Sequence, residues 1–121
     1  MKKLINLLSV FLVLSALAAC KYATVVPDVP SPNVPVYFAA DFQPVFNNNH
    51  CINCHKSGGT MPDLTTGNSY QSLMSNNLVI AGDAASSVLY QKVSTGTMSS
   101  YCDATSAGKI KNWINQGALN N

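Results

Sequence analysis

The sequence has no arginine and no glutamate, and its charged side chains are seven lysines and five aspartates among 121 residues. Lys2 and Lys3 precede the apolar N-terminal run, and without residues 1–19 the formal charges cancel. Such a chain has neither the basic surface of a nucleic-acid-binding protein nor the charge run of an acidic tail. We therefore expect no nucleic acid among its partners.

The chain is also short. A chain of 121 residues has room for one small domain. Domains of this size commonly need disulfides, a metal or a large prosthetic group in addition to their core. The four cysteines are therefore the first residues to interpret.

The N-terminus has the pattern of an export signal. Lys2 and Lys3 precede an almost wholly apolar run, and the stretch Leu17-Ala18-Ala19-Cys20 resembles a bacterial lipobox. We expect residues 1–19 to be a lipoprotein signal peptide and Cys20 to be the acylated first residue of the mature protein. The alternatives are an ordinary signal peptide that ends in cysteine, and an uncleaved anchor, although about 14 apolar residues are few for a membrane span.

An acylated Cys20 would hold the protein on the periplasmic side of a bacterial membrane. Lys21, rather than aspartate, follows it, which by resemblance to known lipoproteins favours the outer membrane. Four prolines punctuate residues 20–35 and favour extended polyproline-type conformation at about 3.1 Å per residue. We expect this segment to be a lipid-anchored tether, or else a disordered leader, outside a folded domain at residues 36–121.

The helical signals in residues 36–121 are short and separated by loops, which predicts an all-α domain of about four short helices. The expected caps or first residues are Asp41, Ser69, Asp83 or Ser86, and Thr105 or Ser106. The residues expected on the buried faces are, in the same order, Phe42, Val45 and Phe46; Tyr70, Leu73 and Met74; Val88, Leu89 and Val93; and Ala107, Ile110, Trp113 and Ile114.

The last helix has the clearest signals. Gly117 is expected to end it. The polar residues expected on its outer face are Lys109, Lys111, Asn112 and Asn115. Four short helices offer little apolar surface, so we expect a buried flat ligand to supply part of the core.

The motif Cys51-Ile52-Asn53-Cys54-His55 identifies that ligand. C-x-x-C-H is the c-type haem attachment signature: the two thiols add across the haem vinyl groups, and the histidine ligates the iron. A thioredoxin-like redox motif would need a βαβ setting, and a structural zinc site would need further ligands, of which Cys102 alone remains. A simple disulfide between Cys51 and Cys54 is the third alternative.

Further short motifs across the domain resemble those of a known family. The motifs are Asp41-Phe42-Gln43-Pro44-Val45-Phe46, the Cys51–His55 motif, Val79-Ile80-Ala81-Gly82-Asp83, Ser87-Val88-Leu89-Tyr90, Gly96-Thr97-Met98, Lys111-Asn112-Trp113-Ile114 and Gly117-Ala118. In this order they resemble small bacterial cytochrome c domains of the class I type, such as those of planctomycete and Bacteroidetes proteins. The resemblance implies a cytochrome c fold around one covalent haem c, His/Met ligation of the iron through His55 and Met98, and electron transfer.

Met98 has one rival as the distal ligand. In the family the methionine is commonly followed by proline, whereas Ser99 follows Met98 and Pro62 follows Met61. Met61 lies only six residues after His55, and six extended residues reach at most about 20 Å, which leaves little slack to round a porphyrin. Met98 is therefore the expected ligand, and Met61 the alternative.

Two further residues have plainer interpretations. His50 precedes Cys51 in an Asn-rich turn and is expected to be solvated rather than an iron ligand. Cys102 has no expected intramolecular partner and is predicted to be a buried, unreactive thiol, with an intermolecular bridge as the alternative.

These residues favour a membrane-tethered periplasmic single-electron carrier, not an enzyme, with redox proteins as partners. The alternatives are an open-site haem protein, peroxidase-like or gas-sensing, and an accessory haem domain of a larger oxidoreductase. An open-site enzyme needs a distal acid–base group. The chain has no arginine, and His50 is its only histidine besides His55.

Overall fold

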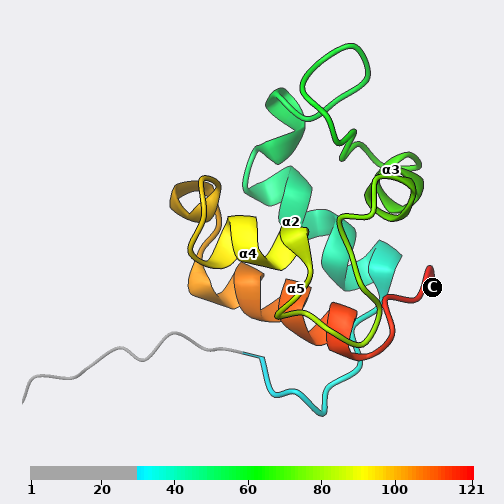
Figure 1. Cartoon of the computed structure of the whole chain (residues 1–121), viewed down its shortest axis with the longest axis vertical. Helices are drawn as coiled ribbons and strands as arrows, with labels where there is room; N and C mark the ends of the chain where they lie inside the picture. Colours follow the sequence, from blue (N-terminus) through cyan, green and yellow to red (C-terminus); the bar gives the residue numbers. More distant parts are fainter. Residues whose placement is uncertain (1–29) are drawn as a thin grey trace, which may run out of the picture.

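The computed structural model describes residues 30–121 (Figure 1). The expected signal peptide, Cys20 and the tether as far as residue 29 lie outside the described residues. Within residues 30–121 the regular structure consists of four α-helices and three shorter helical turns without strands, which confirms the all-α expectation. The elements are η2 (Phe38–Phe42), α2 (Gln43–Asn48), η3 (Cys51–Asn53), α3 (Ser69–Ser75), α4 (Val88–Ser94), η4 (Ser99–Tyr101) and α5 (Ala104–Asn115).

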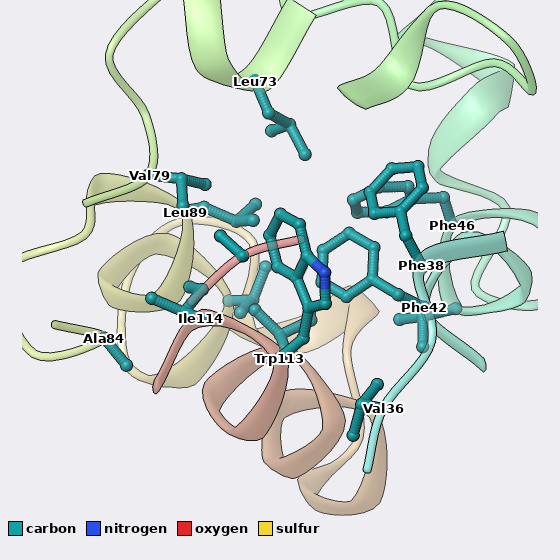
Figure 2. Packing of buried hydrophobic residues seen from close by; sticks show 14 of the residues in the cluster. Val36, Phe38, Phe42, Phe46, Leu73, Val79, Ala84, Leu89, Trp113 and Ile114 are labelled. Atoms are coloured by element: carbon teal, nitrogen blue, oxygen red, sulfur yellow. The ribbon is translucent and has the colours of Figure 1, made fainter. Parts of the chain in front are cut away.

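The elements pack around α5, the longest helix of the described chain. It lies alongside α4 and also contacts η2, which leads directly into α2 (Figure 1). From α3, the side chain of Leu73 points toward Trp113 of α5 (Figure 2). None of the helices in residues 30–121 is long and apolar enough to cross a membrane.

An aromatic cluster around Trp113 forms the centre of the core (Figure 2). The ring centroid of Trp113 lies 4.2 Å from that of Phe42 and 5.3 Å from that of Phe38. Full burial of side chains of this size stabilises a fold by about 1.5–3 kcal/mol each. The other buried apolar residues are Val36, Val45, Phe46, Leu64, Leu73, Val79, Ala84, Leu89, Val93, Ile110, Ile114 and Ala118. The protein therefore forms a continuous core from its own side chains, and the expected shortage of apolar surface does not itself require a ligand.

Two helix starts differ from the expected caps. Asp103, not Thr105 or Ser106, is the N-cap of α5, and its carboxylate accepts a hydrogen bond of 2.8 Å from the Ser106 N–H. Asp41 lies inside η2 rather than ahead of it, and its carboxylate accepts from the Tyr37 N–H at 2.9 Å. Both aspartates still satisfy an N–H at a helix start, which otherwise has no partner within the helix.

The middle helices begin close to the expected positions. Ser69 is the first residue of α3. Ser87 is the N-cap of α4, while the expected caps, Asp83 and Ser86, bond to each other in the preceding turn, where the Asp83 carboxylate accepts from the Ser86 N–H at 3.0 Å.

The expected burial of Val88 is wrong. Its side chain is 39% exposed, whereas Leu89 and Val93 of the same helix are buried. Leu89 and Val93 are four residues apart and share one face of α4, while Val88 is turned away from that face by about a quarter of a turn.

The end of α5 confirms the role of Gly117. This glycine has φ of 103°, a left-handed conformation that most side chains disfavour. Its N–H donates to the carbonyl of Ile114, and the N–H of Ala118 donates to the carbonyl of Trp113, both at 3.0 Å. The last carbonyls of the helix are thereby satisfied.

The last part of the expected tether is bound to α5. The buried amide of Asn112 donates to two backbone carbonyls of this segment, and the side chain of Gln116 bonds to three further backbone atoms. The bonded atoms are the carbonyl oxygens of Pro30, Ser31, Pro32 and Val34 and the nitrogen of Val36. The expected exposure of Asn112 is therefore wrong, because its partners lie about 80 residues away in sequence. The packed unit extends back to residue 30.

A buried polar pair joins α2 to α3. Gln43, the first residue of α2, donates from Nε2 to the carbonyl of Leu64 at 3.0 Å. Its Oε1 accepts a hydrogen bond from the Ser69 hydroxyl. Pro44 follows in the first turn of α2, where its missing N–H has no partner to lose. This pair positions α3 relative to α2, the helix that leads into the cysteine motif.

Candidate cofactor-attachment site

The Cys51–His55 motif forms one helical turn. Cys51 begins η3, and its carbonyl accepts from the N–H of Cys54 at 3.3 Å and from the N–H of His55 at 2.9 Å. His50, with φ of 58°, separates this turn from α2 and is exposed, as expected. Cys51 is half-buried and Cys54 is exposed. The turn presents both thiols and the imidazole from a segment of five residues.

Gly59 allows the following loop to fold back on the motif. A Cβ at this position would lie 2.5 Å from the carbonyl oxygen of Cys54, a contact too short for any side chain. Because the loop passes this closely, the N–H of Thr60 donates to that same Cys54 carbonyl at 2.9 Å. The N–H of Leu64 then donates to the carbonyl of His55 at 2.9 Å.

The loop fixes the imidazole of His55. Its Nδ1 atom lies 3.2 Å from the carbonyl oxygen of Thr60. A carbonyl oxygen only accepts hydrogen bonds, so Nδ1 carries a proton, and in the neutral imidazole Nε2 keeps its lone pair. A partner of this kind orients a metal-ligating histidine and selects its tautomer. Thr60 could not be recognised from the sequence because the contact uses its backbone; the Gly58-Gly59 pair is the sequence signal that a close loop follows the motif.

The structure separates the two candidate methionines by burial. Met61 is 61% exposed, whereas Met98 is half-buried against the core. Gly96 places Met98: a Cβ there would lie 2.8 Å from the Lys92 Cα, so the chain can turn back closely and the Met98 N–H donates to the Lys92 carbonyl at 3.0 Å. In Figure 1 the gold segment around Met98 and the green loop after His55 are separate projections from the helical body.

The edge of the core carries a rim of half-buried side chains. These are Cys51, Ile52, Tyr70, Met74, Leu78, Tyr90, Met98, Cys102 and Ala107. The first two belong to the motif turn, and others come from α3, α4 and the two segments that follow these helices. A pair of thiols and an oriented imidazole on one turn, with Cys51 and Ile52 half-buried against the apolar core, fits the donor set of a covalently bound haem.

The two half-buried thiols resist ionisation. Partial burial raises the pKa of Cys51, and its backbone hydrogen bonding offsets part of that shift. Burial, together with the negative charges of Asp103 and of an ionised Cys51, raises the pKa of Cys102 to about 12. Cys102 is therefore protonated near neutral pH, although it is half-buried rather than fully buried. Its predicted lack of reactivity stays a prediction.

A cavity of about 330 Å³ lies elsewhere on the molecule. Its lining residues are Phe38, Ala39, Gln43, Thr66, Gly67, Ser69, Tyr70, Gln71 and Asn120. These include none of the motif residues and neither candidate methionine. The cavity is therefore separate from the chemistry that the motif indicates.

The alternatives to haem attachment gain no support within residues 30–121. This part of the chain has no strand, so it lacks the βαβ setting of a thioredoxin-like motif. It also contains no group of three or more His, Cys or acidic side chains placed to hold a metal ion. Cys51, Cys54 and Cys102 are free thiols.

Comparisons with known proteins found no matching family model, no matching curated protein and no matching solved structure.

Proposed function

We propose that this chain is a monohaem c-type cytochrome that carries single electrons, and that its all-α domain has the cytochrome c fold. One observation carries the proposal: the Cys51–His55 motif forms a single turn in which the Thr60 carbonyl orients His55 with Nε2 free. This is the arrangement that covalent attachment and axial ligation by one short segment require.

The chain's residues divide the work of holding the cofactor. Cys51 and Cys54 would hold haem through two thioether bonds, each made by addition of an S–H across a vinyl group. His55 would bind the iron through Nε2, and Met98 would bind it through its thioether sulfur. Haem iron, when bound, provides a one-electron couple between ferric and ferrous states.

Met98 suits a carrier because ligation of both iron faces leaves no open position for a substrate. Its half-buried thioether lies at the rim of the core, and the unbranched side chain can adapt its direction to a buried metal. Thioether ligation stabilises ferrous iron and raises the reduction potential.

The alternative of an open-site enzyme or gas sensor has less support. Acid–base chemistry at a distal site requires a titratable side chain near the vacant iron position. The chain has no arginine, and its second histidine, His50, is exposed and directly precedes Cys51 on the attachment turn. An accessory haem domain of a larger oxidoreductase uses the same site, so it remains the second candidate.

The proposed location is the periplasmic side of a bacterial membrane, with Cys20 acylated and the outer membrane favoured by Lys21. The hydrogen bonds of Asn112 and Gln116 to residues 30–36 make these residues part of the packed unit rather than of the proposed tether. Redox proteins are the proposed donor and acceptor.

A redox titration of the holoprotein under carbon monoxide and under argon tests this function. We expect one reversible one-electron transition, low-spin spectra in both states, and no carbon monoxide binding on the timescale of mixing. Rapid carbon monoxide binding together with peroxide turnover would instead establish an open-site haem protein.

A further inference from the structure

Cys102 lies beside the segment that carries Cys51, at the start of α5. Asn49, two residues before Cys51, donates from Nδ2 to the Ser106 hydroxyl at 3.1 Å. That hydroxyl donates in turn to the carboxylate of Asp103 at 2.8 Å. Two hydrogen bonds therefore connect Asn49, two positions before Cys51, with Asp103, which directly follows Cys102.

The Cys51 thiol lies close to the backbone of Asn49, the residue that makes this connection. Its Sγ lies 3.9 Å from the carbonyl oxygen of Asn49, the same residue that bonds to Ser106. Cys51 and Cys102 are both half-buried against the same apolar core, and both are free thiols. Their proximity agrees with the electrostatics, because an ionised Cys51 contributes to the raised pKa of Cys102, after burial and Asp103.

We propose that Cys51 and Cys102 are a disulfide pair in the chain before haem is attached. The bond would join the attachment turn to the N-terminus of α5, which the Asn49–Ser106 hydrogen bond already holds together. Cys54 is the competing partner for Cys51. It is exposed, however, and does not share the half-buried setting of the other two thiols.

The oxidation needs a disulfide oxidant of the exported compartment, such as an oxidised dithiol protein or oxidised glutathione. Each of the two cysteines loses its hydrogen, and one S–S bond forms between them. The S–S bond of the oxidant breaks and accepts the two electrons and two protons as two thiols. Haem takes no part in this step.

The disulfide would control when Cys51 can react. While its sulfur is bonded to Cys102, it cannot form a thioether, so reduction must precede attachment. This consequence rests on the proposed function, whereas the bond itself does not. After attachment Cys102 would return to a free thiol beside the motif.

Peptide mapping of the full chain, produced without haem attachment, tests the proposal. The protein is equilibrated with a mixture of reduced and oxidised glutathione, quenched with N-ethylmaleimide and cut with trypsin without reductant. Cleavage after Lys21, Lys56, Lys92 and Lys109 places Cys51 and Cys54 together in residues 22–56 and Cys102 in residues 93–109. Cys20 falls in a third peptide, so a bond to Cys20 gives a different mass, while fragmentation distinguishes a bond at Cys51 from one at Cys54.

We expect residues 22–56 to be linked to residues 93–109 in the unaltered chain and in Cys54→Ser, and the link to be lost in Cys51→Ser. Fragmentation of the linked peptides from the unaltered chain locates the bond even if a variant does not fold. The proposal is overturned if Cys102 is recovered alkylated, bonded to Cys54, or bonded to Cys20.

A second arm separates this inference from the proposed function. Haem is offered to the oxidised chain with and without prior reduction. We expect attachment only after reduction. If haem fails to attach in both cases while the Cys51–Cys102 link is present, the disulfide stands and the proposed function fails.

Discussion

The imidazole of His55 is held by the backbone of Thr60, with Nδ1 3.2 Å from the Thr60 carbonyl oxygen. The contact depends on a loop that passes within van der Waals distance of the motif at Gly59. Any residue larger than glycine at this position would push the loop away from the Cys54 carbonyl. The orientation of the proposed iron ligand is thus set by a residue without a side chain.

Gly59→Ala should therefore change the orientation of the His55 imidazole without removing any of the proposed iron ligands. The added methyl group forces a backbone shift that we expect to cost roughly 1–3 kcal/mol of stability. In nitrogen NMR spectra of the haem-free chain, His55 should lose its preference for the Nδ1–H tautomer. Ser57→Ala, at an exposed position of the same loop, is the control. Unchanged stability and an unchanged tautomer in Gly59→Ala would show that the loop does not position His55.

Replacing each candidate methionine separately tests the distal ligand. Met98→Ala should abolish the weak long-wavelength sulfur-to-iron band of the ferric protein and open the iron to carbon monoxide. It should also lower the reduction potential, by an amount on the order of tenths of a volt. Met61→Ala should leave all three properties unchanged, because Met61 is largely exposed. The reverse result, with band and potential lost only in Met61→Ala, would identify Met61 as the ligand.

The pairing of Gln43 with Ser69 predicts a specific loss of stability. Gln43→Leu leaves the Leu64 carbonyl and the Ser69 hydroxyl without their partner in a buried site, at a cost of roughly 1–3 kcal/mol. Gln43→Leu combined with Ser69→Ala should recover part of that loss. Urea unfolding measures the free energy of unfolding of both variants, with Gln71→Leu on the exposed face of α3 as the control. Equal stabilities of Gln43→Leu and Gln71→Leu would contradict the role of the pair.

Asp103 predicts a dependence of stability on pH. Hydrogen bonds from Ser106 lower the pKa of this carboxyl below its ordinary value of 3.8 in the folded state. The charged cap therefore contributes stability above the unfolded pKa, and that contribution is lost as the pH falls through the lower, folded pKa. Near neutral pH, Asp103→Ala should cost about 1 kcal/mol.

The comparison is made by urea unfolding at neutral and at strongly acidic pH, with Ser100→Ala as the control. The difference in free energy of unfolding between the unaltered chain and Asp103→Ala should shrink in acid, since a protonated carboxyl is a weaker acceptor at the cap. A difference that stays constant across this range would contradict the hydrogen-bonded cap.

The sequence predicted the helices because their apolar residues follow the helical period. Leu89 and Val93 on α4, and Ile110, Trp113 and Ile114 on α5, are buried as expected. The helix starts were less predictable. Asp103 and Ser106 are both good caps within one turn, and the choice between them depends on which backbone N–H each side chain reaches.

Contacts distant in sequence could not be predicted in the same way. The period of α5 places Asn112 toward the outside, and it is buried only because residues 30–31 cover it. The Cys51–His55 motif was recognisable because its chemistry is local. The Thr60 carbonyl and the burial of Met98 depend on how two loops return to the helices, which no periodic pattern records.

Acid–acetone extraction followed by intact mass measurement tests the central claim most directly, because it asks whether haem is bonded to this polypeptide. The protein is produced in cells that attach haem to exported chains, together with a variant in which Cys51 and Cys54 are both serine. We predict that the extracted protein keeps the mass of one haem, and that the variant does not. Recovery of the unaltered chain as haem-free polypeptide would contradict the account.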